Sequence, residues 1–142
     1  MSTNKTTHYQ LNQWEAEDKV LRTEFNEDNQ KIDAAMRNLY SAVPRVASGF
    51  YVGDGTEVRL IELEFTPRAV FVCRNNGCTY ESGTIWGGLA VTGSPLVESY
   101  GSQTCTGLAI AENGFLVYNE KISYRSGASN ALGQTYHYIA LG

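Results

Sequence analysis

Two glutamates, Glu62 and Glu64, have a spacing that could support acid–base chemistry. On one face of an extended strand such residues lie about 7 Å apart, and some glycosidases use a pair of carboxyl groups at a similar separation. The stretch "VRLIELEF" alternates the glutamates with Ile61 and Leu63, which is typical of a strand with one solvated face. We therefore interpret both glutamates as surface residues.

Other residues suited to nucleophilic catalysis or metal binding are few. An odd number of cysteines without a visible signal peptide favours reduced thiols, and the spacing of Cys73 and Cys78 is not usual for a zinc site. His137 alternates with tyrosines in "TYHYIAL", as a strand residue would, and His8 lies in a polar terminus. The thiols, Cys105 included, are interpreted as small core residues. We predict no catalytic, metal or cofactor site, and hence no enzyme.

Aromatic residues are more informative, with nine Tyr and two Trp in 142 residues. Their flat, amphipathic rings suit sugar stacking or protein contacts. Tyr80, Tyr100 and Tyr124 lie in or beside loops rich in Gly and Ser, where binding residues are often carried. We name these three as receptor-binding candidates; the alternative is that they are strand residues with one wet edge. Trp86 is expected in the core.

Composition and charge exclude several classes of protein. Hydrophobic residues make up 42% and charged residues 18%, which suits a folded chain rather than a disordered one. The net charge is −4 and no cluster of Lys and Arg exists, so nucleic-acid binding is not expected. The start "MSTNKTTHYQ" has no apolar segment of a signal peptide. The longest apolar runs, such as "AVFVC", are too short for membrane insertion.

From residue 46 onwards the sequence shows period-two alternation and frequent turn signals. "GFYVGDGTEVRLIELEF" predicts two strands around a Gly-Asp-Gly turn, and "RAVFVCR" predicts a strand buried on both faces. The pair Asn113-Gly114, between "LAIA" and "FLVY", is a strong hairpin signal. Seven or eight short strands predict an antiparallel β-sandwich or jelly-roll-like domain over residues 46–142.

Residues 11–40 contain neither Gly nor Pro and predict a long helix. Asn12 and Glu15 have the spacing of a capping box. Pro44 disfavours helical backbone just before it, so the helix should end near Ser41. About 28 residues would form a rod about 42 Å long. The chain is therefore expected to be mainly β with an N-terminal α element.

A heptad frame fits this helix, with apolar residues at seven of nine positions. Asp18 and Asp28 are the two misfits, and "FNEDNQ" leaves open a helix pair that is broken near Asn26–Asn29. We expect residues 1–45 to oligomerise and dock, with a homotrimer as the expected state. The alternative is that the helix lies on the chain's own β domain. The positions assigned to oligomerisation are Leu11, Trp14, Leu21, Phe25, Ile32 and Leu39.

Together these motifs resemble small tail-appendage proteins of bacteriophages and prophages of Gram-positive hosts. "YQLNQWEAEDKVLRTEFNEDNQKIDAA", with Trp14 and the Leu21–Phe25 pair, is similar to their N-terminal helical segment. "FTPRAVFV", "NGFLV" and the terminal "YHYIALG" resemble a β module of phage tail proteins. The resemblance touches most of the chain. It implies a virion tail component, often trimeric, whose β domains point outwards and whose tail-fibre-like members serve adsorption to the host.

We therefore expect a tail-fibre-like protein that is assembled in the host bacterial cytoplasm and located in the virion tail. Its expected partners are further copies of itself, other tail or baseplate proteins, and a polysaccharide or protein of the host surface. Two other functions stay open. One is a purely structural tail or baseplate protein without receptor contact, and the other is a tail-associated cell-wall or polysaccharide hydrolase.

Overall fold

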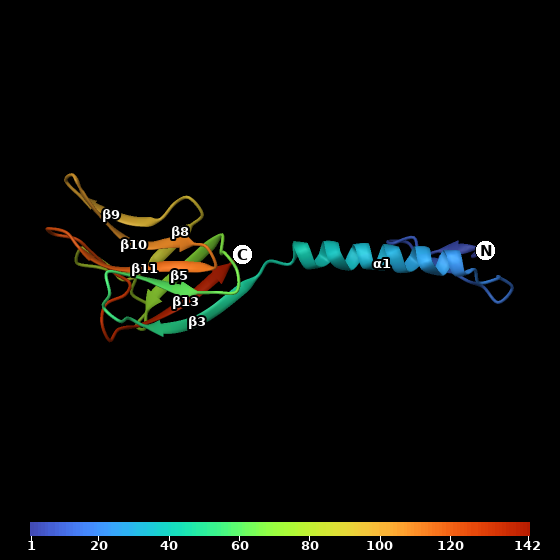
Figure 1. Cartoon of the computed structure of the whole chain (residues 1–142), viewed down its shortest axis with the longest axis horizontal. Helices are drawn as coiled ribbons and strands as arrows, with labels where there is room; N and C mark the ends of the chain where they lie inside the picture. Colours follow the sequence, from blue (N-terminus) through green and yellow to red (C-terminus); the bar gives the residue numbers. More distant parts are fainter. The chain divides into compact units, whose positions relative to one another are not determined.

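The computed structural model describes all 142 residues, in which a single helix near the N-terminus precedes mainly β structure (Figure 1). The chain forms two compact units, Met1–Pro44 (unit 1) and Arg45–Gly142 (unit 2). The prediction of a mainly β protein with an N-terminal helix is confirmed. No helix combines the length and the apolar character that a membrane span requires.

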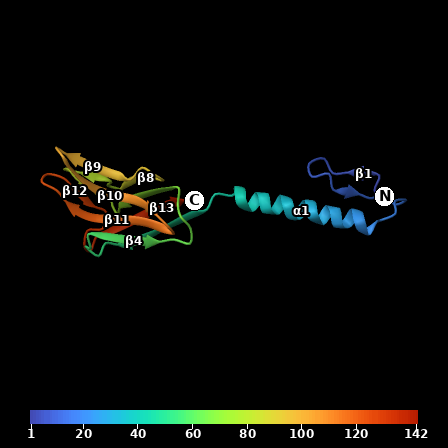
Figure 2. The ribbon, with the colours of Figure 1, turned by 45° about the horizontal axis from the view of Figure 1, so that its top comes forward.

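Unit 1 consists of a short hairpin, β1 (Asn4–Lys5) and β2 (Asn12–Gln13), followed by the helix α1 (Arg22–Ala42). Figure 2 shows β1 alongside α1. The predicted helix start is wrong, because Asn12 is a strand residue and makes no capping box. The polar side chains of this stretch find partners in the segment before it: Glu15 accepts a hydrogen bond from Asn4 Nδ2 at 3.0 Å.

Helix α1 has 21 residues, fewer than the predicted 28. It begins after Leu21, whose backbone is extended (φ −101°, ψ 135°) and whose side chain makes no capping hydrogen bond. It runs without interruption through Asn26–Asn29, so the alternative of a broken helix is wrong. The helix ends at Ala42, close to the predicted Ser41, because Pro44 disfavours helical backbone before it.

Unit 2 contains two β-sheets built from eleven strands. These are β3 (Val46–Val52), β4 (Val58–Glu62), β5 (Ala69–Arg74), β6 (Tyr80–Glu81), β7 (Thr84–Ile85), β8 (Gly88–Val91), β9 (Leu96–Tyr100), β10 (Gln103–Ala111), β11 (Gly114–Lys121), β12 (Ser126–Ala128) and β13 (Thr135–Leu141). The smaller sheet has the antiparallel order β3-β13-β5-β8. The larger has the order β6-β7-β12-β11-β10-β9, and β4 also pairs with β11, beside which it lies in Figure 2. Its β7–β12 pair is parallel, so the larger sheet is mixed rather than antiparallel throughout.

The core of unit 2 lies between these sheets and takes residues from both. Phe115 of the larger sheet and Tyr136 of the smaller are both fully buried. Tyr136 stacks on Tyr51 with ring centroids 5.1 Å apart. The Tyr51 hydroxyl donates to the Ser129 carbonyl at 2.7 Å, and the Tyr136 hydroxyl donates to the Ala128 carbonyl. Burial raises the pKa of Tyr136 to about 12, so this phenol stays neutral.

A cluster of hydrogen-bonded polar side chains supports the chain where it crosses from β3 to β4, which belong to different sheets. Asn130 is fully buried and donates to Asp54 Oδ1 at 2.7 Å and to the Thr56 carbonyl at 2.9 Å. The Thr56 hydroxyl and backbone N–H also donate to Asp54, and together these bonds lower the pKa of Asp54 to about 2. The predicted Gly-Asp-Gly turn is therefore a crossover held by side chains.

The hairpin predicted at Asn113-Gly114 joins β10 to β11, which confirms that prediction. The two turn residues are Glu112 and Asn113, and Asn113 has a left-handed φ of 54°. Gly114 pairs with Ala111 as the first strand residue. A Cβ at Gly114 would lie 2.2 Å from the Ile61 carbonyl oxygen of β4, so only glycine fits there.

The apolar sequence of β5 predicted a strand buried on both faces, and this prediction is wrong. Val70 and Val72 are buried in the core, whereas Phe71 between them is 43% exposed. The reason is that nothing in unit 2 covers the outer side of the smaller sheet. A continuous apolar run here indicates an exposed apolar face rather than a central layer.

Candidate assembly and binding surfaces

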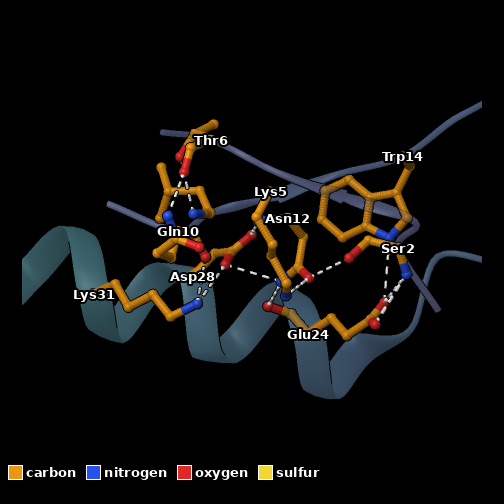
Figure 3. Close-up of polar contacts among 10 residues, drawn as sticks. Ser2, Lys5, Thr6, Gln10, Asn12, Trp14, Glu24, Asp28 and Lys31 are labelled. Carbon is orange, nitrogen blue, oxygen red and sulfur yellow. Dashed lines mark hydrogen bonds and ion pairs between the residues drawn. The ribbon is translucent and has the colours of Figure 1, made fainter. Parts of the chain in front are cut away.

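A network of polar contacts ties the N-terminal segment of unit 1 to α1 (Figure 3). Asp28 is only 7% exposed and accepts hydrogen bonds from the backbone N–H and side-chain Nδ2 of Asn12, at 2.8 and 2.9 Å. Lys31 Nζ lies 3.5 Å from the same carboxylate. Burial opposes ionisation, but the Asn12 and Lys31 contacts outweigh it and lower the pKa of Asp28. The misfit aspartate of the heptad is thus satisfied within the chain.

Two further carboxylates of unit 1 accept hydrogen bonds from the N-terminal segment; Glu24 belongs to α1, whereas Asp18 precedes it. Glu24 accepts from the Ser2 backbone N–H at 3.0 Å and from Trp14 Nε1 at 3.2 Å (Figure 3). Burial opposes ionisation of Glu24, but these hydrogen bonds outweigh it and lower the pKa of Glu24. Asp18 accepts from the Thr3 hydroxyl and backbone N–H, at 2.5 and 2.9 Å, and these bonds lower its pKa. All three carboxylates accept hydrogen bonds, and these contacts favour their ionised forms.

The placement of the six predicted oligomerisation residues is partly wrong. Leu11 and Trp14 lie outside α1 and Leu21 is its extended cap residue, so no single helix carries all six. The three that α1 carries are Phe25, Ile32 and Leu39. The heptad frame failed in its first half because hydrogen bonds to the N-terminal segment compete there with helix formation.

Helix α1 carries an exposed apolar stripe, which we define as Phe25, Ile32, Met36 and Leu39. Met36 and Leu39, at 66% exposed each, are the least covered. A groove of about 240 Å³ separates part of the stripe from the hairpin residues Tyr9 and Leu11. The two buried side chains of unit 1, Asn12 and Asp28, are both polar. Unit 1 therefore has no apolar core of its own.

The three candidate tyrosines lie close together in unit 2. Tyr100 and Tyr124 have ring centroids 4.9 Å apart, and the Arg125 guanidinium lies 5.5 Å from the Tyr100 ring. Glu98 accepts from Arg125 Nε at 3.1 Å and from the Tyr80 hydroxyl at 3.4 Å. We call these five residues the tyrosine platform. Its aromatic rings are exposed, so the arrangement can stack on a flat ligand.

The platform lies at one end of unit 2. Tyr100 is the last residue of β9, and Tyr124 and Arg125 lie in the connection between β11 and β12. Figure 1 shows these connections at the end of the sheets away from the C-terminus. The chain enters unit 2 at the C-terminal end, where the Gly142 N–H donates to the Arg45 carbonyl at 2.8 Å. Sequence reasoning missed Glu98 and Arg125, which are 27 positions apart and show no local signal.

Trp86 packs against the core, as expected, and its ring lies 4.5 Å from the Arg74 guanidinium. Its indole N–H is buried and has no hydrogen-bond partner. Arg74 also lies 3.5 Å from Glu81, at the start of the turn between β6 and β7. We assign Trp86 to the support of the smaller sheet rather than to a binding surface.

The residues considered for catalysis lie apart. Strand β4 ends at Glu62, so Glu64 follows the strand, and both side chains are exposed. Cys105 is buried and burial raises the pKa of its thiol, whereas Cys73 and Cys78 are partly exposed, contrary to the core assignment. His137 is an exposed residue of β13, and its Nε2 lies 3.0 Å from Asn75 Oδ1. No three His, Cys, Asp or Glu side chains form a group that could hold a metal ion.

Comparison of the chain with protein-family models, curated proteins and solved structures gave no match. The function of the chain is therefore inferred from its own surfaces and motifs.

Proposed function

We propose that this chain is a non-enzymatic virion tail-appendage protein, whose unit 1 assembles copies and docks them to the tail. The observation that carries the proposal is the exposed apolar stripe on a unit without a buried apolar side chain. A chain segment of this size rarely folds without an apolar core or an oligomer, and helices draw most of their stability from packing an amphipathic face. Packing stripe against stripe supplies the missing core.

Unit 2 has the role of contacting the host surface through the tyrosine platform. The platform supports this role because it lies away from Arg45, where the chain enters unit 2. Loops at the free end of a β scaffold are a common location for binding residues. The motif resemblance supports the setting in a phage tail, with other tail or baseplate proteins as docking partners and a trimer as the expected state.

Light scattering tests the assembly. We expect a mass of about three times the 15.7 kDa of one chain. Ile32→Asp/Leu39→Asp places two charges in the stripe and should reduce the mass to that of one chain, because unpaired charges are strongly disfavoured in an apolar seam. Thr23→Asp/Gln30→Asp, two exposed positions that are also seven apart but off the stripe, makes the same change in charge and is the matched control. A wild-type monomer at tens of micromolar would contradict the proposal.

Incubation with host cell-wall fractions tests the contact. We expect binding without turnover, which Tyr124→Ala weakens and which Val58→Ala, an exposed residue of β4, leaves unchanged. No binding to any fraction would favour a purely structural tail or baseplate protein. Released sugar would favour a hydrolase.

A further inference from the structure

The smaller sheet of unit 2 presents an outer side that is almost entirely apolar. Each of its four strands alternates between core residues and outward residues. We call the outward set the apolar sheet face: Val46, Ser48, Phe50 and Val52 of β3, Thr135, His137, Ile139 and Leu141 of β13, Ala69, Phe71 and Cys73 of β5, and Leu89 and Val91 of β8.

Strand register brings these side chains into rows. Ile139 pairs with Ser48 on one side and Phe71 on the other, and Phe71 pairs with Leu89. The next row joins Val46, Leu141, Ala69 and Val91 in the same way. Four strands about 4.8 Å apart and about 20 Å long give a face of roughly 400 Å² in plan. That is as large as the biggest apolar patch of an ordinary monomer.

The face holds no Asp, Glu, Lys or Arg, although unit 2 has a net negative charge. The outer side of the larger sheet differs, since it carries Glu62 and Glu120. Loss of charge, rather than apolarity alone, distinguishes the centre of an interface from ordinary surface. β3 is moreover an edge strand without Lys or Pro, the residues that usually protect an edge.

We propose that the apolar sheet face is an interface between copies of this chain. An uncharged face does not repel its own copy, whereas a charged face would. Only Val43–Arg45 separate α1 from β3, a reach of about 10 Å. Assembly of copies through α1 would therefore raise the effective concentration of their smaller sheets.

The size of the face agrees with a tethered contact. A stable complex of independent proteins buries about 800 Å² per partner, roughly twice what this face offers in plan. It should therefore associate when α1 holds the copies together and not otherwise. The inference rests on the proposed assembly through the stripe, and the experiment separates the two.

Thiol labelling of the full chain tests the face. Ser48→Cys places an exposed thiol in the row that contains Ile139 and Phe71, and Thr104→Cys places one on β10 of the larger sheet. Both are made in a Cys73→Ala/Cys78→Ser background, in which the remaining Cys105 is buried. We expect the thiol of Ser48→Cys to react with a maleimide at least about tenfold more slowly, because a packed interface excludes the reagent.

Adding Ile32→Asp/Leu39→Asp should make the two rates equal. If the protein is an oligomer by mass and both thiols react equally fast, the proposed interface is wrong, whereas assembly through α1 stands. If the thiol of Ser48→Cys stays slow in a variant that is monomeric by mass, its own chain covers the face and the proposal fails. A parent protein that is itself a monomer overturns both proposals.

Discussion

Units 1 and 2 are stabilised by opposite means. Unit 2 buries ten apolar or aromatic residues between two sheets, whereas the two residues that unit 1 buries, Asn12 and Asp28, form a hydrogen-bonded polar pair. Hydrogen bonds fix geometry but add only about 1 kcal/mol each to stability. Unit 1 is thus well specified in shape and weakly stabilised, so its folding is expected to depend on assembly.

The largest expected effect comes from one phenylalanine in each unit. Phe115→Ala should destabilise unit 2 by about 3–5 kcal/mol, because it leaves a cavity in a fully buried core. Phe25→Ala removes an exposed ring of the stripe and should leave the melting of unit 2 unchanged. It should instead lower the oligomer mass on dilution. Thermal melts at several protein concentrations distinguish the two effects. A loss of thermal stability for Phe25→Ala that does not depend on concentration would contradict the expected difference between the units.

A smaller effect is expected from the two buried asparagines. Asn130→Ala removes the donors to Asp54 and Thr56 at the crossover and should destabilise unit 2 by about 1–3 kcal/mol. Asn12→Ala removes one donor to Asp28 and should loosen the hairpin. Urea melts of unit 2 measure the first change, and amide exchange in β1 and β2 measures the second. A loss of unit 2 stability in Asn12→Ala would show that the units do not behave independently.

Local patterns predicted what local contacts determine. The alternation of the strands, the Asn113-Gly114 hairpin and the apolar positions Phe25, Ile32 and Leu39 all follow from periods of a few residues. The N-terminal hairpin was not predicted, because its main partner pair, Asn12 and Asp28, is 16 positions apart.

The same reason explains what was missed in unit 2. The parallel contact of β7 and β12 joins residues about 40 positions apart, and the salt bridge of the tyrosine platform joins residues 27 apart. Hydropathy alone could not distinguish a strand buried on both faces from the exposed apolar face of β5. That distinction depends on whether another layer covers the sheet, which the strand's own sequence does not encode.

Acid should affect unit 1 before unit 2, because ionised carboxylates hold the hairpin of unit 1. Asp18, Glu24 and Asp28 have lowered pKa values, against ordinary values of 3.8, 4.5 and 3.8. Their contribution is complete above the ordinary pKa and is lost as pH falls through the lowered one. The hairpin should therefore loosen below about pH 4. Asp54 of unit 2, with a pKa of about 2, keeps its contribution to lower pH.

Trp14 fluorescence in a Trp86→Phe variant measures this transition in unit 1 alone. We expect its emission to change below about pH 4 while the β-type circular dichroism of unit 2 is retained. Emission that stays constant until acid unfolds unit 2 as well would show that the carboxylates do not hold the hairpin.

The smallest effect is expected from the tryptophans themselves, one in each unit. The Trp86 N–H is buried without a partner, so Trp86→Phe removes a desolvated donor and this gain offsets part of the lost packing. Phe also presents an aromatic ring to Arg74. The stability of unit 2 should change by less than about 1 kcal/mol. Trp14→Phe instead removes the donor to Glu24 and should speed amide exchange at Ser2, which shares that carboxylate. A loss above about 2 kcal/mol for Trp86→Phe would mean that the indole N–H has a partner and that the core of unit 2 also depends on polar contacts.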